Sequence, residues 1–167
     1  MAGKADFTPD EWAKVLTAPM LAGMAVTLAE PTGLFGILKE GMASGRALLE
    51  ARNDPGASAL SKAVAADMET SEGRTAAREA LQAELSSKSP AEIKQKAIST
   101  LAEVAAVLDA KAPQDAAGFK DWLLHIAERV AEASTTGGFF GFGGVEVTEA
   151  EKTTIAEIAA ALKIPAA

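Results

Sequence analysis

Apolar residues recur at helical spacing along most of the chain, so that each group of them lies on one face of an α-helix. This pattern predicts an all-α protein, with about six to eight helices in a single-domain bundle that spans residues 1–167. The stripes are Trp12, Val15 and Leu16; Leu34, Ile37, Leu38, Leu48 and Leu49; Leu60, Val64 and Met68; Ala77, Leu81 and Leu85; Ile93, Ala97, Leu101, Val104 and Leu108; Phe119, Trp122, Leu123, Ile126 and Val130; and Ile155, Ile158, Ala159 and Leu162.

Three of these helices begin with a capping box, in which a Ser or Thr side chain and a Glu three residues later satisfy each other's backbone N–H groups. Two of the three also carry a proline at the first helical position, where its missing N–H costs nothing. The pairs are Thr8 with Glu11, Ser89 with Glu92, and Thr148 with Glu151.

Proline, glycine and short polar side chains predict where the helices are interrupted. Pro19 either breaks the first helix or begins a second one, which runs on to Pro31, and Pro165 ends the last helix. Two turns are predicted at residues 53–56 and 70–73.

A helix is expected from about Gly33 to Arg52, with Thr32 as its cap. Gly41 and Gly45 form a small-xxx-small pair within it, and in an alanine-rich bundle such a pair lets two backbones approach closely.

The segment from Ala18 to Leu38 is mostly apolar, so a membrane span has to be considered. Pro19, Pro31 and the turn that follows Pro31 interrupt it, and the longest unbroken apolar run is shorter than the roughly 20 residues that cross a bilayer. The segment therefore predicts two buried helices joined by a turn and no membrane span.

Composition narrows the classes of function. The net charge of −7 and the pI near 4.8 disfavour nucleic acid as a partner, because nucleic-acid binding depends on Lys and Arg. The chain has no cysteine, which excludes disulfides and thiol chemistry. The first residues lack the apolar core of a secretory signal, and we expect a cytoplasmic protein.

The segment from Thr135 to Glu151 combines five glycines with three phenylalanines and leads into the last helix. Exposed aromatic rings in a glycine-rich loop are costly, so Phe139, Phe140 and Phe142 are either anchored in the core, line a pocket or await a partner. They are the candidate partner-binding or ligand-binding residues, in a hairpin of helix, Gly/Phe loop and helix.

Residues 144–151 and the alanine-rich stretch 155–162 resemble the closing hairpin of TerB-like proteins, an all-helical bacterial family associated with tellurite resistance. Family members carry Asp-Gly and further acidic residues in this turn, which suggests divalent-cation binding. This chain departs from that pattern with Gly143 and Gly144, and we therefore expect no divalent cation at this turn, where only Glu146 and Glu149 offer oxygen ligands.

The rest of the sequence offers few residues for catalysis or for binding a cofactor. His125, the only histidine, can share a helix face with Asp121, Glu128 and Glu132. A di-metal bundle needs Glu-x-x-His on two helices, so we interpret this group as a solvated polar face rather than a metal site. The chain has no Gly-x-Ser-x-Gly motif and no phosphate-binding P-loop, and we expect neither an enzyme nor a cofactor.

The sequence supports two functional hypotheses. The first is a non-enzymatic interaction or scaffold module that presents the Gly/Phe loop to another protein or to a second copy of itself. The alternative is a helical bundle that binds an apolar small molecule or a lipid, with the loop phenylalanines and Met20, Met24 and Met42 lining the cavity.

Overall fold

The computed structural model describes residues 1–29, 45–135 and 147–165. The prediction of an all-α fold with about six to eight helices is confirmed, because these residues form seven α-helices and no strand. The elements are the short 3-10 helix η1 (Lys4–Asp6), α1 (Pro9–Thr27), a helix at residues 45–53, α3 (Ala59–Glu69), α4 (Ser71–Leu85), α5 (Pro90–Lys111), α6 (Pro113–Thr135) and α7 (Glu149–Ala161).

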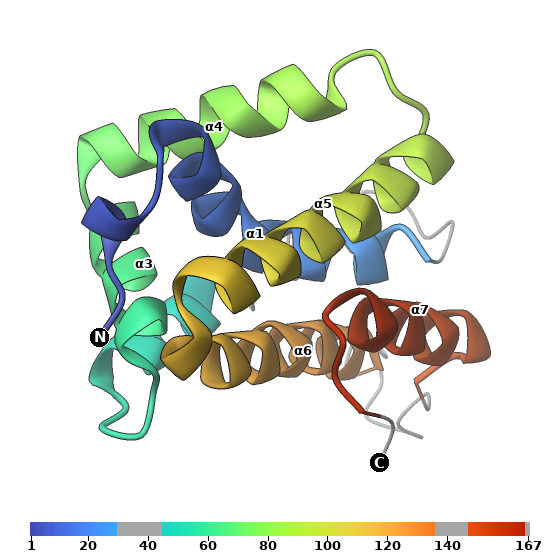
Figure 1. Cartoon of the computed structure of the whole chain (residues 1–167). Coiled ribbons are helices and arrows are strands. Elements are labelled where there is room, and N and C mark those ends of the chain that lie inside the picture. Colours follow the sequence, from blue (N-terminus) through green and yellow to red (C-terminus); the bar gives the residue numbers. More distant parts are fainter. Residues whose placement is uncertain (30–44, 136–146, 166–167) are drawn as a thin grey trace.

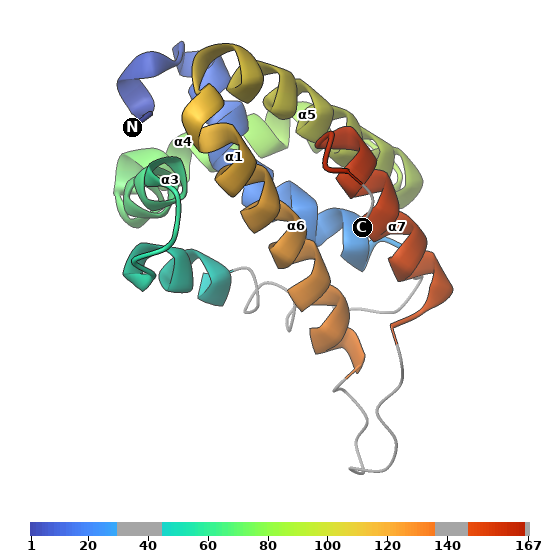
Figure 2. The same cartoon turned by 60° about the horizontal axis from the view of Figure 1, so that its bottom comes forward.

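Helix α1 lies at the centre of the molecule. It packs against α3, α4, α5, α6 and α7, which surround it in Figures 1 and 2. A helix that is covered on most sides must carry apolar or small residues around most of its circumference. Its buried residues are Trp12, Val15, Leu16, Thr17, Ala18, Pro19, Leu21, Ala22, Gly23, Ala25 and Val26.

Most of the other helices add large side chains to the same core. Helices α6 and α7 lie side by side and run in opposite directions (Figure 2), as expected for the two arms of a hairpin. The largest fully buried side chains outside α1 are Leu60 on α3, Leu101 and Leu108 on α5, Phe119, Leu123 and Ile126 on α6, and Ile158 together with Leu162 at the end of α7.

Pro19 lies inside α1, so the prediction that it breaks the first helix or begins a second one is wrong. A proline in a helix removes one backbone hydrogen bond and clashes with the preceding turn, which costs about 3 kcal/mol. Burial of α1 against five other helices offsets this cost, and Pro19 is itself part of the buried surface. The helix ends at Thr27, ahead of Pro31.

No described helix combines the length and the apolar character that a membrane span needs. The apolar start of the segment at residues 18–38 is instead the second half of α1, and its remainder from residue 30 lies outside the described residues.

All three predicted capping boxes are present. In each box the hydroxyl of the capping residue accepts from the backbone N–H three residues on, and the glutamate accepts from the N–H of the capping residue. The distances from this N–H to the glutamate oxygen are 2.8 Å for Thr8 and Glu11, 2.7 Å for Ser89 and Glu92, and 2.9 Å for Thr148 and Glu151.

The predicted turn at residues 70–73 joins α3 to α4 through a single residue. The Thr70 hydroxyl accepts from the Gly73 N–H at 2.9 Å and donates to the Asp67 carbonyl at 2.7 Å, so it caps both helices. A Cβ atom at Gly73 would lie 2.1 Å from the Asp67 carbonyl oxygen. Only glycine allows α4 to begin this close to the end of α3.

The inner face of the helix at residues 45–53 differs from the prediction. Leu49 was expected to face the core, but it is 57% exposed, while Ala47 and Ala51 are buried. Leu34, Ile37 and Leu38 of the same predicted stripe, like the expected start at Gly33, lie outside the described residues.

The prediction that Gly45 lets two backbones approach is wrong. Gly45 is exposed, and a Cβ atom placed on it would meet no described heavy atom within 4 Å. Gly41, the other member of the pair, lies outside the described residues.

Helix α7 ends before Pro165, contrary to the prediction. Lys163 adopts a left-handed conformation with a φ of 57° and donates its N–H to the Ala160 carbonyl at 3.1 Å. The Ile164 N–H donates to the Ala159 carbonyl at 2.9 Å. These two bonds form a Schellman motif, which satisfies the last carbonyls of the helix without a proline.

We expect Gly73→Ala to lower the free energy of unfolding by about 1–3 kcal/mol, because the added methyl group meets the Asp67 carbonyl. Gly45→Ala is the matched control, and it should raise stability by roughly 0.5–1 kcal/mol, since the added Cβ of this helical residue meets no described heavy atom. Urea unfolding of both variants measures the difference. Equal effects would contradict the close approach of α3 and α4.

An ion pair between Lys14 on α1 and Glu103 on α5 gives stability a pH dependence. Their side-chain hydrogen bond is the main cause that raises the pKa of Lys14 and lowers the pKa of Glu103. A carboxyl group with a lowered pKa in the folded state stabilises the fold above its unfolded pKa, and this contribution is lost as the pH falls through the folded-state value.

We therefore expect Glu103→Gln to lower the free energy of unfolding at neutral pH by at most about 1 kcal/mol, because both side chains are partly exposed. The deficit should shrink as the pH falls below the pKa of an ordinary glutamate. Glu79→Gln, an exposed residue of α4, serves as the control. A deficit that is equally large at neutral and at acid pH would contradict the role of this pair.

Candidate functional site

An open groove of about 580 Å³ lies between α1, the end of α3 and the outer helix α4. We call it the α1–α4 groove; in Figure 1, α4 lies along the edge of the molecule and covers one end of α1. Its volume is within the range of about 300–1,000 Å³ that is usual for ligand sites. The lining residues are Met20 on α1, Met68 on α3, and Ser71, Arg74, Thr75, Ala77, Arg78 and Leu81 on α4.

Helix α4 packs against α1 but buries few of its own residues. Gly73 and Ala77 are the only buried residues of α4. Met20, Met68 and Leu81 pack against the edge of the core but stay partly exposed. Their apolar surfaces therefore remain accessible, and the two methionines have unbranched side chains that adapt to irregular shapes.

The α4 residues of the groove form one face of the helix. Ser71, Thr75 and Arg78 follow one another at spacings of four and three, and Arg74 and Leu81 continue the same face. The face extends for about 15 Å, at roughly 1.5 Å per residue. The hydroxyls of Ser71 and Thr75 make no hydrogen bond with the described part of the chain.

The two arginines of the groove differ from the other three arginines of the chain. Arg46, Arg52 and Arg129 each form an ion pair with a glutamate. Arg74 and Arg78 form no ion pair with any described residue, and Arg78 makes no hydrogen bond either. They are four residues apart on α4, a spacing at which like charges repel.

Arg74 has a structural role at the end of α3. Its Nη1 donates to the carbonyl of Glu69 at 2.5 Å and to the carbonyl of Met68 at 3.4 Å. A cation at this position is favourable, because the last carbonyls of a helix lack partners and carry partial negative charge. The remaining N–H groups of its guanidinium make no further bond with described residues.

No carboxylate among the described residues lines the groove. Glu79 follows Arg78 directly on α4, and adjacent helical residues do not face each other. The nearby acidic side chains at the junction of α3 and α4 have partners outside the groove. Asp67 accepts from Trp12 at 2.7 Å and pairs with Lys4, Glu69 pairs with Arg52, and Glu72 pairs with Lys4 at 3.5 Å.

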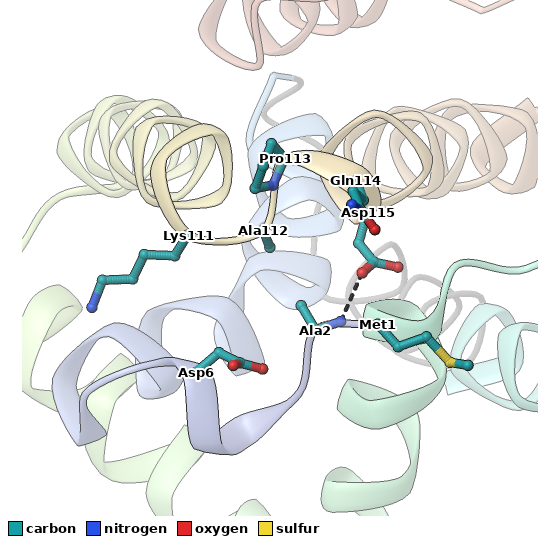
Figure 3. Close-up of a pocket in the computed structure, with 8 residues that line it drawn as sticks. All are labelled: Met1, Ala2, Asp6, Lys111, Ala112, Pro113, Gln114 and Asp115. Atoms are coloured by element: carbon teal, nitrogen blue, oxygen red, sulfur yellow. Dashed lines mark hydrogen bonds between the residues drawn. The ribbon is translucent and has the colours of Figure 1, made fainter.

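A second, smaller hollow of about 240 Å³ lies between the amino-terminal segment and the start of α6 (Figure 3). Its charged side chains already have partners within the chain, so they offer little to a ligand. Asp115 accepts from the Ala2 N–H at 2.7 Å, Asp6 accepts from the Gly3 N–H at 2.8 Å, and Lys111, which points away from Asp115 in Figure 3, pairs with Glu11 at 2.5 Å.

The candidate residues of the Gly/Phe loop, Phe139, Phe140 and Phe142, lie outside the described residues. Of the methionines predicted to line an apolar cavity, Met20 lines the α1–α4 groove and Met24 does not. Met42 lies outside the described residues.

His125 lies on the exposed side of α6, with 56% of its side chain accessible. Its Nε2 accepts from Arg129 at 3.2 Å, and its Nδ1 lies 3.8 Å from Glu128. In the described part of the chain, no three His, Cys, Asp or Glu side chains are placed to hold a metal ion together. At the turn before α7, Glu149 pairs with Lys152 at 2.8 Å, and Glu146 lies outside the described residues.

Sequence reasoning missed Arg74 and Arg78 as site residues. The signal in the sequence is their spacing of four residues. It places two like charges on one face of a helix with few apolar residues, and Leu81 lies on the same face. Met68 and Leu81 were predicted as core residues, and both contact the core while also lining the groove.

Comparisons with protein-family models, curated proteins and solved structures give no match. The resemblance of the last hairpin to TerB-like proteins therefore stays a prediction, and the candidate site is defined by its geometry alone.

The two groove arginines should differ in their contribution to stability. Arg74→Gln should lower the free energy of unfolding by about 1 kcal/mol, because it removes the hydrogen bonds to the end of α3. Arg78→Gln should change it by less than about 0.5 kcal/mol, since Arg78 bonds to no described residue. Thermal unfolding of the two variants tests this, and equal losses would contradict the distinction.

Proposed function

We propose that this protein is a non-catalytic binding module that holds an apolar small molecule or a lipid chain in the α1–α4 groove. The observation that carries the proposal is the groove itself, which is lined by the partly exposed apolar side chains of Met20, Met68 and Leu81. A ligand that covers these side chains removes apolar surface from water, which gains about 25 cal/mol for each Å² buried.

The chemistry of the groove favours binding over catalysis. Its nucleophilic candidates are the hydroxyls of Ser71 and Thr75, and no histidine or carboxylate among the groove residues is placed to activate them. The scaffold hypothesis based on the Gly/Phe loop stays a prediction, because the loop phenylalanines lie outside the described residues.

Titration with dodecanol, a neutral single-chain alcohol, tests the proposal. We expect saturable binding that shifts the NMR signals of the Met20 and Met68 methyl groups, which line the groove, more than those of Met1 and Met24, which do not. Uniform shifts, or shifts confined to Met1 and Met24, would place the ligand elsewhere.

A groove-filling substitution provides the second arm of the test. Thr75→Phe puts a ring into the groove and should weaken dodecanol binding at least about tenfold. Thr153→Phe on the exposed side of α7 adds the same ring away from the groove and should leave binding unchanged. The proposal is wrong if dodecanol does not bind, or if the two variants bind it equally well.

A further inference from the structure

We propose that the ligand of the α1–α4 groove is a free single-chain amphiphile with an anionic head group, and that Arg78 and Arg74 hold this head group while the apolar side chains take the chain. This inference rests on the proposed function and specifies the chemical class of its ligand. It is drawn from the two kinds of side chain that line the same groove.

The charge environment of the two arginines supports an anion. The chain has 23 acidic residues against 16 lysines and arginines, so carboxylates are abundant, and every arginine outside the groove pairs with one. Arg74 and Arg78 pair with none of the described carboxylates. An anion between them would offset their mutual repulsion and supply the partner that the fold does not.

The available donors fit an oxyanion. All five N–H donors of the Arg78 guanidinium remain without a partner in the described structure, and a guanidinium fork matches the two oxygens of a carboxylate. The unbonded hydroxyls of Ser71 and Thr75 lie on the same face of α4 and add two short-range donors.

The rest of the groove fits an apolar chain. Met20, Met68, Ala77 and Leu81 contribute its apolar surface, and no described acidic side chain lines the groove. The groove face of α4 is roughly 15 Å long, which suits a chain of medium length. A free head group alone would leave this surface uncovered, and a neutral chain alone would leave the two guanidinium groups without an anionic partner.

The experiment compares dodecanoate with dodecanol, which share one chain and differ in the head group. By calorimetric titration below the concentration at which dodecanoate forms micelles, we expect dodecanoate to bind at least about tenfold more tightly. High salt should weaken the binding of dodecanoate and leave that of dodecanol nearly unchanged.

Substitutions of arginine show which positive charge binds the head group. Arg78→Gln should weaken dodecanoate binding by about tenfold without affecting dodecanol, and Arg78→Lys should give an intermediate affinity because it keeps the charge and loses the fork. Arg129→Gln is the matched control, since Arg129 is an exposed arginine that pairs with Glu50 away from the groove. It should change neither affinity.

The outcomes separate this inference from the proposed function. Equal affinity for the two ligands, with no effect of Arg78→Gln, would overturn the anionic head group and leave apolar binding in place. If neither ligand binds, both proposals fail. Sedimentation with phosphatidylglycerol vesicles, in the absence of any binding of dodecanoate, would assign the anion to a membrane surface and overturn the free amphiphile.

Discussion

The burial of α1 on most of its sides is the constraint on which the rest of this structure depends. Helices α3, α4, α5, α6 and α7 pack against α1. Helix α1 therefore has to carry apolar or small residues around most of its circumference. This burial explains the apolar start of the segment at residues 18–38, which forms the second half of α1. It also explains how a helix of 19 residues tolerates Pro19 in its interior, since packing offsets the lost hydrogen bond.

The same constraint produces the candidate site. Helices α5 and α6, which pack against α1, bury large side chains, whereas α4, which also packs against α1, buries only Gly73 and Ala77. The groove lies beside Met20, and the cap at Thr70 fixes where α4 begins. The groove is thus a consequence of uneven covering of a central helix. Its arginines lie on the outer helix, where no described carboxylate reaches them.

Much of the fold could be predicted from the sequence because its signals are local. Thr8, Ser89 and Thr148 each begin a helix through contacts within three residues, and the apolar stripes follow the period of the helix itself. The wrong predictions concern contacts between helices, which local sequence patterns do not contain. Whether Pro19 interrupts a helix, and whether Leu49 faces the core, depends on which helices pack against them.

The site could be predicted far less well, for the same reason. Met20, Met68 and Leu81 belong to three helices, and only the fold brings them to one groove. Periodicity placed Met68 and Leu81 on apolar faces, but it does not show that those faces stay partly exposed. The absence of an ion pair at Arg78 is also a property of the folded chain, because a sequence with this many glutamates offers a partner to every arginine.

The most direct test of the central claim is a crystal structure of the protein with dodecanoate. We expect electron density for the dodecanoate chain beside Met20, Met68 and Leu81, with the carboxylate within hydrogen-bond distance of the Arg78 guanidinium. An empty groove in a crystal that holds dodecanoate at another place on the molecule would contradict it.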